Sequence, residues 1–261
     1  MKIYDCFMYN NEKLILDLRL NHLNEYAEKF IIVESKYDHQ GKIKKEFLNI
    51  DEFSNFKKKI IHLFIDEFPK NISNWERESY QRNFILNALN DISDEDYIMI
   101  SDVDEIPNLK NLDNVTRYKY TAFLQKNFCY KFNLINKTFP IWHGTKMCKK
   151  KYLKSPQWLR KQKVKKISFI NFLKIRWNIV DNGGWHFSFL MAPDKIQNKI
   201  KSYAHAEFNT EIFTNLENIE NKVKNNKDIF NRDQYYEKVE IDHTYPLYIK
   251  RNLESLKNWI L

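Results

Sequence analysis

Tyr97-Ile-Met-Ile-Ser-Asp-Val-Asp-Glu-Ile-Pro107 is the stretch that decides most about the fold of this chain. A run with strand character ends in Asp102-x-Asp104-Glu105, and Pro107 then stops the element. Because the backbone turns where a strand ends, these acidic side chains can converge, and they repel one another unless a hard cation lies between them. Oxygen ligands of this kind suit Mg²⁺ or Mn²⁺. The pattern predicts a metal site, and the alternative is a solvated acidic turn that caps a helix at Asn108.

Strand and helix patterns alternate through the first hundred residues. We expect strands at 2–9, 30–33, 59–65 and 97–101, with helices at 11–26 and 74–92. Short β-rich runs separated by helices of this length imply βαβ units and a mostly parallel sheet.

Acidic residues follow three of these strands. Glu34 ends the second, Asp66 and Glu67 follow the third, and Asp102 with Asp104 ends the fourth. The carboxyl ends of parallel strands lie at one edge of a sheet, where open α/β folds bind their ligands. We therefore expect these acids to gather into a metal and nucleotide site.

The second half of the chain is less regular. We expect antiparallel strands within 117–135, a strand at 183–190, a helix from Pro193 to about 206, an exposed helix or loop at 214–227 and a C-terminal segment that packs on the body. Repeats and linkers are absent. The prediction is a single α/β domain over residues 1–261, with a mostly parallel central sheet flanked by helices and an antiparallel edge in the C-terminal half.

The net charge of +9 is spread along the chain. Lysines are densest at Lys57–Lys59, Lys149–Lys151 and Arg160–Lys166. A basic protein attracts phosphates, nucleic acid or anionic membranes. Tyr152 and Trp158 lie among the last two runs, which would suit a nucleic-acid stripe. The interpretation that we favour is a solvated basic face.

Glycine and cysteine usage excludes two kinds of site. With 4 glycines the chain lacks Gly-rich phosphate loops, so a nucleotide would have to be held by side chains and a metal. Cys6, Cys129 and Cys148 form neither a zinc motif nor a disulfide framework, which indicates a reducing compartment. The chain opens on a strand rather than a signal peptide, and no run reaches the ~18 apolar residues that span a bilayer. We expect a cytoplasmic protein.

Arg82 lies on the 74–92 helix, off its apolar stripe, with Glu78 one turn earlier. Two interpretations stay open. The pair is an exposed i,i+4 ion pair of small energy, or Glu78 orients a guanidinium that binds a diphosphate.

Gly183-Gly-Trp-His-Phe-Ser188 places His186 between aromatic residues, after two glycines that allow a ligand to approach the backbone closely. His186 is a packed core histidine, or it completes a Mn²⁺ shell or contacts a pyrophosphate. Trp185 packs in the core, or it stacks on a sugar or base.

Several segments, in their order along the chain, resemble glycosyltransferase family 17. The D-x-D-E-I-P and G-W-H-x-S segments are the most specific part. The matching segments are Glu12 with Asp17-Leu-Arg19, Phe30-Ile-Ile-Val-Glu-Ser35, Phe68-Pro69, the Tyr80/Arg82 helix, Ile100–Pro107, Gly184–Ser188 with Pro193, and Tyr248–Asn252.

The resemblance implies a GT-A-type fold, with a nucleotide-binding half at 1–107 and an acceptor-side half with the C-terminal helices at 108–261. It implies a nucleotide-sugar donor, usually UDP-GlcNAc, a glycan or lipid-linked glycan acceptor, and inversion at the anomeric carbon. The chain shows no counterpart of the animal enzymes' membrane anchor and stem. We therefore expect a bacterial or viral member without a specific nucleic-acid partner, and peripheral membrane contact stays open.

The resemblance also implies roles for the charged residues. Mn²⁺ or Mg²⁺ held by Asp102, Asp104 and His186 would neutralise the leaving phosphate, with help from Arg82. Glu34 would contact the nucleotide's base or ribose. The base that deprotonates the acceptor hydroxyl is one of three carboxylates: Glu105, Asp181 or Glu207.

Two other classes remain as alternatives. The acidic cluster and the positive charge would also suit a metal-dependent nuclease or nucleotidyltransferase, which would bind nucleic acid in a steeply salt-dependent way. Trp158 and Trp185 would suit a non-catalytic glycan-binding module.

Overall fold

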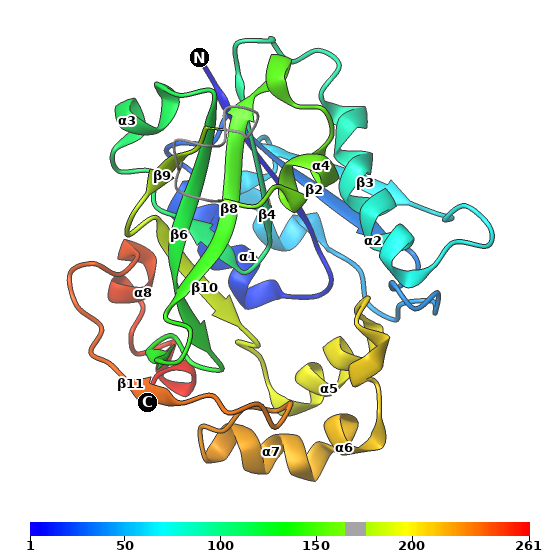
Figure 1. Ribbon diagram of the computed structural model, residues 1–261, viewed down its shortest axis with the longest axis vertical. Coiled ribbons are helices and arrows are strands. Elements are labelled where there is room, and N and C mark those ends of the chain that lie inside the picture. The colour runs from blue at the N-terminus through cyan, green and yellow to red at the C-terminus, as the bar shows by residue number, and fades with distance from the viewer. Residues whose placement is uncertain (165–175) are drawn as a thin grey trace, which may run out of the picture.

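A computed structural model describes residues 1–164 and 176–261 (Figure 1). Four parallel strands form the centre of its sheet in the order β3-β2-β1-β4. They are β1 (Ile3–Met8), β2 (Lys29–Ser35), β3 (Ile60–Ile65) and β4 (Tyr97–Asp102). β1, β2 and β4 are buried along most of their length, which explains why they read as continuous apolar runs.

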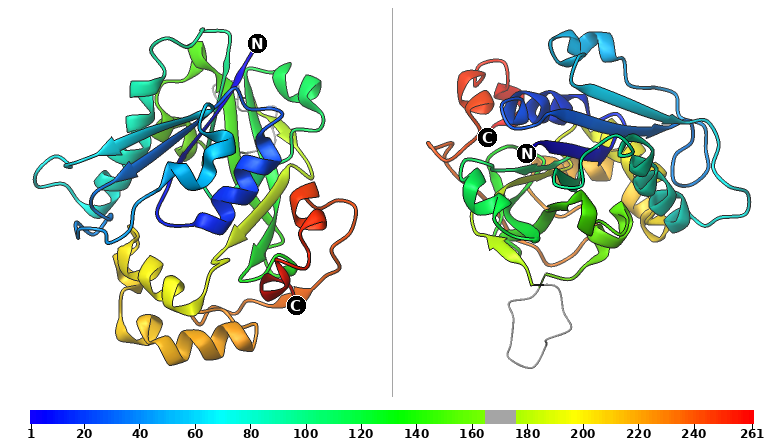
Figure 2. Two further views of the ribbon diagram at one scale, coloured as in Figure 1. Left: turned by 180° about the vertical axis from the view of Figure 1, so that it is seen from behind. Right: turned by 90° about the horizontal axis from the view of Figure 1, so that it is seen from above.

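Helices cover both faces of this parallel part. On one face, α1 (Lys13–Leu23) buries Leu16 and Leu20 against Phe7 and Phe30 of the sheet, and α8 (Leu247–Arg251) packs beside it. Figure 2 shows α1 in front of the sheet when the molecule is seen from behind. On the other face lie α2 (Asn74–Asn83), the 3₁₀ helix Phe84–Ala88 and α4 (Pro156–Lys161).

The C-terminal half extends the same sheet with antiparallel strands. β8 (Ile141–Lys149) pairs antiparallel with both β4 and β6 (Tyr120–Cys129), and β7 (Leu134–Asn136) and β11 (Tyr236–Lys238) follow. β9 (Asn178–Val180) runs parallel to β6. The predicted α/β class, with a mostly parallel centre and an antiparallel C-terminal edge, is confirmed.

β10 (Gly184–Ser188) brings the G-W-H-x-S segment beside the D-x-D segment. It pairs antiparallel with β5 (Glu105–Pro107) and parallel with β6, so that His186 faces Glu105 on one side and Asn127 on the other. Gly184 is required because a Cβ there would lie 2.0 Å from the Ile106 carbonyl oxygen. The close approach that we predicted for these glycines is therefore to neighbouring strands rather than to a ligand: Gly184 lies against β5, and Gly183 against Val180 and β6.

A third group of helices packs below the sheet. α5 (Pro193–Ser202) and α7 (Leu216–Lys224) bury Ile196, Ile200 and Ile219 together, with α6 (Glu211–Thr214) between them in sequence (Figure 1). The remaining short elements are α3 (Leu112–Thr116) and the 3₁₀ helices Ile50–Phe56, Lys150–Tyr152, Ala206–Phe208 and Lys257–Trp259.

Some boundaries differ from the predictions. The 74–92 helix ends at Asn83 and tightens into the 3₁₀ helix, and Pro107 ends β5 rather than β4. The predicted alternative of a helix cap at Asn108 is wrong, because the next helix begins at Leu112 and Asn111 occupies its N-cap position. In the described part of the chain, none of the helices is long and apolar enough to span a bilayer.

Candidate active site

A buried arginine shapes the turn that carries both aspartates. Arg19 of α1 is fully buried and forms a bidentate ion pair with Asp5 of β1, at 2.6 and 2.7 Å. Its Nη1 also donates to the carbonyl oxygens of Asp102, Val103 and Glu105, at 3.1, 3.2 and 2.8 Å. These bonds curl the backbone directly after β4, with Val103 pointing into the core.

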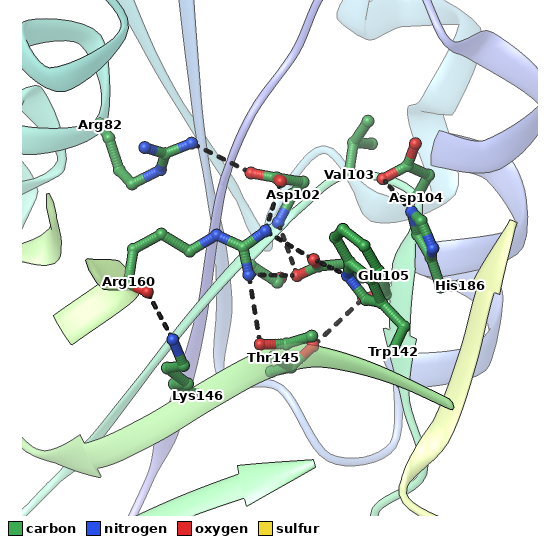
Figure 3. Close-up of polar contacts among 12 residues, drawn as sticks. Arg82, Asp102, Val103, Asp104, Glu105, Trp142, Thr145, Lys146, Arg160 and His186 are labelled. Carbon is green, nitrogen blue, oxygen red and sulfur yellow. Dashed lines mark hydrogen bonds and ion pairs between the residues drawn. The ribbon is translucent and has the colours of Figure 1, made fainter. Parts of the chain in front are cut away.

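The turn sends Asp102 and Asp104 to different neighbours (Figure 3). The Asp102 carboxylate accepts from Arg82 Nη2 at 3.1 Å and from Arg160 Nη2 at 2.6 Å. Burial opposes ionisation of Asp102, but the charge of Arg160, then that of Arg82, outweighs it and holds the pKa of this carboxyl well below its usual range. Asp102 is therefore an anion that holds two guanidinium groups at the cavity wall.

Glu105 lies behind Asp102 and is completely buried. Its carboxylate accepts from the Asp102 backbone N–H at 3.1 Å, from Trp142 Nε1 at 2.6 Å, and from both terminal nitrogens of Arg160 at 2.7 and 3.1 Å. Buried beneath four donors, this carboxylate is not placed to take a proton from a substrate. The predicted role of Glu105 as the base is not supported; it holds Arg160 and Trp142 in position.

Capping residues that the sequence shows begin the two helices that carry Arg82 and Arg160. Ser73 and Glu76 form a capping box at the start of α2, which carries Arg82, and Arg82 also pairs with Glu78 at 2.8 Å. Ser155 caps α4, which carries Arg160, by accepting from the Trp158 N–H. The i,i+4 pair of Arg82 is real, but the arginine is buried rather than exposed.

Lys146 of β8 lies beneath Arg160. Its ammonium donates to the Arg160 carbonyl oxygen. Burial, with a contribution from the neighbouring Arg160 charge, lowers the pKa of Lys146 to about 8. The arginine side of the site therefore holds three cationic side chains close together.

Asp104 faces His186 instead. Its Oδ1 lies 3.7 Å from His186 Nε2. Asn127 donates its amide N–H to the Phe139 carbonyl at 3.0 Å, so its Oδ1 accepts from His186 Nδ1 at 3.0 Å. A neutral imidazole held in this way keeps the lone pair of Nε2 toward Asp104, which is how protein histidines are prepared as metal ligands. Trp142 stacks on the imidazole with ring centroids 4.5 Å apart.

Lys199 of α5 completes this second group. Its ammonium lies 3.3 Å from Asp104 Oδ2 and 3.2 Å from Glu12 Oε1. Burial opposes the charge on Lys199, but Asp104 and Glu12 outweigh it and raise the pKa of the lysine above its ordinary value. Burial also raises the pKa of Glu12, which Lys199 opposes.

The predicted ligand set of Asp102, Asp104 and His186 does not converge. Among residues 1–164 and 176–261 no group of three or more His, Cys, Asp or Glu side chains is placed to hold a metal ion. Asp102 is turned away by its two arginines. Asp104 and His186 still offer a carboxylate oxygen and an imidazole nitrogen 3.7 Å apart, and the other positions of a Mg²⁺ or Mn²⁺ ion would go to water and phosphate oxygens.

The other predicted acids lie elsewhere. Glu34 is buried and engaged by Lys44 at 2.7 Å, His62 at 3.2 Å and the Leu48 N–H at 3.0 Å. Asp66 and Glu67 are exposed. The predicted gathering of all strand-end acids is therefore wrong, because Glu34 has its own cations and Asp66 and Glu67 are exposed to solvent.

Asp181 and Glu207 are both exposed, and Glu207 binds His205 at 2.7 Å. Neither lines the cavity described next. Trp185 is buried in the core with its ring edge against His22, so the core interpretation of this residue holds and it does not face a ligand.

A cavity of about 880 Å³ opens between the two halves of the chain. The two sides of the site, Asp102 with its arginines and Asp104 with His186 and Lys199, both line it. Tyr9, Ser35, Tyr37 and Trp75 come from the N-terminal half, and Phe139, Trp142, Tyr203 and Phe230 from the C-terminal half.

The structure also bears on the predicted basic face and on the predicted role of Trp158. Lys149 and Lys151 pair with Glu95, and Lys150 with Asp94, so this basic run is balanced by acidic neighbours. Lys165 and Lys166 of the Arg160–Lys166 run lie outside the described residues. Trp158 is half-buried against Tyr120, which is a packing role rather than an exposed sugar platform.

Sequence reasoning missed four residues of the site: Asn127, Trp142, Arg160 and Lys199. Arg160 stood in a lysine-rich run, and Lys199 on an amphipathic helix, so both looked like surface charges. The sequence around Trp142 gives no sign that its indole N–H donates to the Glu105 carboxylate. The registers of β10 with β5 and β6 are what bring His186 to Asn127.

Comparison with known proteins agrees with the resemblance. The model of Glycosyltransferase family 17 matches residues 1–236. Beta-1,4-mannosyl-glycoprotein 4-beta-N-acetylglucosaminyltransferase is similar to this chain, at 21% identity over 242 residues for the Homo sapiens protein and 22% over 235 residues for the Mus musculus protein. These alignments cover 79% of this chain and 44% of each relative, so the chain spans less than half the length of these relatives.

Among solved structures, 2-C-methyl-D-erythritol 4-phosphate cytidylyltransferase of Francisella tularensis is similar at 11% identity and a TM-score of 0.31, over 58% of this chain and 74% of that chain. So distant a likeness carries no argument about the site.

Proposed function

The chain belongs to glycosyltransferase family 17, and from that premise we propose that it transfers N-acetylglucosamine from UDP-GlcNAc to a hydroxyl of a glycan or glycoconjugate, with inversion and with the help of a divalent cation. The single observation that carries the proposal is one cavity lined both by Arg82 and Arg160, which pair with Asp102, and by Lys199, Asp104 and His186.

Three cations beside a two-ligand metal site suit a diphosphate. A nucleoside diphosphate leaving group gains negative charge as its bond to the sugar breaks, and fixed cations stabilise that charge in the transition state. Arg82 and Arg160 are oriented before the donor arrives because Asp102 and Glu105 hold their guanidinium groups. Guanidinium forks of this kind suit phosphate oxygens.

Asp104 and His186 are the residues that would hold the cation. A Mn²⁺ or Mg²⁺ ion there supplies Lewis-acid neutralisation of the leaving diphosphate. Asn127 fixes the imidazole orientation through Nδ1, and Trp142 covers one face of the ring. These contacts keep the Nε2 lone pair aimed at the Asp104 carboxylate.

The two halves of the cavity divide the substrates in this proposal. Residues 1–107 contribute Tyr9, Ser35 and Tyr37 on the nucleotide side, and residues 108–261 contribute Phe139 and Trp142 on the acceptor side. Glu34 would act on the nucleotide side through Lys44, which lines the cavity, rather than by direct contact. A base at Asp181 or Glu207 would have to reach the acceptor from outside the cavity lining.

A thermal-shift screen of nucleotide sugars with and without Mn²⁺ tests the donor. A ligand at a hundredfold excess over its Kd stabilises the folded protein by about 2.7 kcal/mol. We expect UDP-GlcNAc with Mn²⁺ to give the largest shift, and mass spectrometry to detect a HexNAc added to an acceptor glycan. If no nucleotide sugar shifts the melting temperature while single-stranded nucleic acid does, a nuclease or nucleotidyltransferase replaces this proposal.

A further inference from the structure

Lys199 bridges two carboxylates from different parts of the chain. Glu12 precedes α1, Asp104 follows β4, and the Lys199 ammonium lies within 3.3 Å of an oxygen of each. The three side chains are between 6% and 21% exposed. Such a group is seldom buried without a function or a partner for each charge.

Lys199 is held on every side. α5 is anchored by the buried side chains of Ile196 and Ile200, and the Phe189 ring lies 5.6 Å from the ammonium. Glu12 is itself fixed, because its Oε2 accepts from the Asn10 N–H at 2.9 Å. The ammonium therefore extends from an anchored helix toward a fixed Glu12 and can turn between nearby oxygens.

The charges of this group make it unsuited to a cation alone. Two carboxylates and one ammonium leave a single negative charge, and His186 is neutral as a ligand. A divalent ion bound by Asp104 and His186 would lie next to the Lys199 ammonium, and like charges this close in a partly buried site repel strongly. The repulsion falls when an anion arrives that contacts both.

We propose that Lys199 makes cation binding at Asp104 and His186 depend on the donor diphosphate. In the free protein the ammonium satisfies Asp104, and with the donor bound it turns from Asp104 to a diphosphate oxygen while Glu12 keeps hold of it. This inference rests on the proposed function and adds the residue that couples the two ligands. Coupling of this kind is reciprocal: the diphosphate raises affinity for the cation by the same factor as the cation raises affinity for the diphosphate.

Mn²⁺ binding, measured by electron paramagnetic resonance and calorimetry with and without UDP, tests the proposal. We expect UDP to raise the affinity of the unaltered protein for Mn²⁺ by about tenfold or more. Lys199→Met keeps the length of the side chain and removes the charge, so it should bind Mn²⁺ alone about tenfold more tightly and lose most of the enhancement by UDP.

Lys195→Met is the matched control. Lys195 lies one turn earlier on α5 and pairs with Glu46 at the surface, at 2.9 Å. This variant should keep the coupling of the unaltered protein. Lys199→Arg, which retains the positive charge, should keep it as well, and Lys199→Gln, which also removes the charge, stands in for Lys199→Met should that variant melt below the assay temperature.

Two failures are distinguishable. If UDP strengthens Mn²⁺ binding equally in the unaltered protein and in Lys199→Met, and Mn²⁺ alone binds both equally, the role of Lys199 is refuted and the proposed function stands. If the unaltered protein binds no Mn²⁺ even with UDP present, the cation in the proposed function is refuted, and the inference with it.

Discussion

The arginine side and the histidine side of the site differ in how their aspartates are used. Asp102 and Asp104 are separated by one residue, yet Asp102 neutralises Arg82 and Arg160 while Asp104 faces the His186 imidazole and shares Lys199. Asp102 is committed to protein cations, and Asp104 is open to an external one. The difference teaches that the neighbours brought by the fold, rather than the D-x-D pattern, decide what each carboxylate does.

Removing Arg160 should have the largest effect on stability. Arg160→Met leaves Glu105 buried without an ion partner, and breaking a buried pair in this way costs about 3–5 kcal/mol. Urea denaturation measures the loss. The control Lys57→Met removes an exposed pair with Asp51 and should cost less than about 1 kcal/mol. Equal losses in the two variants would show that the arginine side is not a buried network.

Replacing each aspartate separately by asparagine tests whether Asp102 and Asp104 have different roles. Asp104→Asn should lower kcat/KM by about 100-fold or more, because it would remove a ligand of the cation that we propose stabilises the transition state. The melting temperature should stay within about 4 °C. Asp102→Asn should leave Mn²⁺ affinity in the presence of UDP nearly unchanged. Equal loss of Mn²⁺ binding in both variants would restore the original three-ligand assignment.

Cation binding at Asp104 and His186 can be weakened without replacing either residue. Asn127→Ala removes the acceptor that orients His186, and loss of such an outer partner typically costs about 10-fold or more in metal affinity. Mn²⁺ titration with UDP present measures the change. Asn225→Ala, on the exposed end of α7, is a surface control that should leave the affinity unaltered.

The arginine side should also show the burial of Lys146 as a pH dependence of stability. The pKa of Lys146 is about 8 in the folded protein, below the ordinary lysine pKa of 10.5. The unfolded chain therefore binds more protons between these values, so stability rises with pH there, by about 1 kcal/mol between pH 8 and 9. Below pH 8 Lys146 is charged in the folded protein, and the whole cost of burying its ammonium then lowers the free energy of unfolding.

Lys146→Met should lack this rise. The informative measurement is the difference in unfolding free energy between the variant and the unaltered protein at pH 7, 8 and 9, because other titrating groups cancel in it. If this difference in unfolding free energy stays constant from pH 7 to pH 9, Lys146 does not titrate near pH 8.

The fold was accessible from local patterns. Apolar runs at 30–33 and 97–101 identified buried strands, and the strand–helix alternation identified a mostly parallel sheet, because hydrophobic periodicity is a property of neighbouring residues. The helix boundary at Asn83 was missed, since the change to a 3₁₀ helix depends on packing against the sheet.

What the sequence by itself determined is a list of reactive side chains in two short segments: Asp102, Asp104 and Glu105 in the first, and His186 in the second. Only the tertiary structure decided their roles. Arg160 comes to Asp102 from 58 residues away and Lys199 to Asp104 from 95 residues away. Ion pairs between remote elements depend on how the helices dock, and no local pattern records that docking.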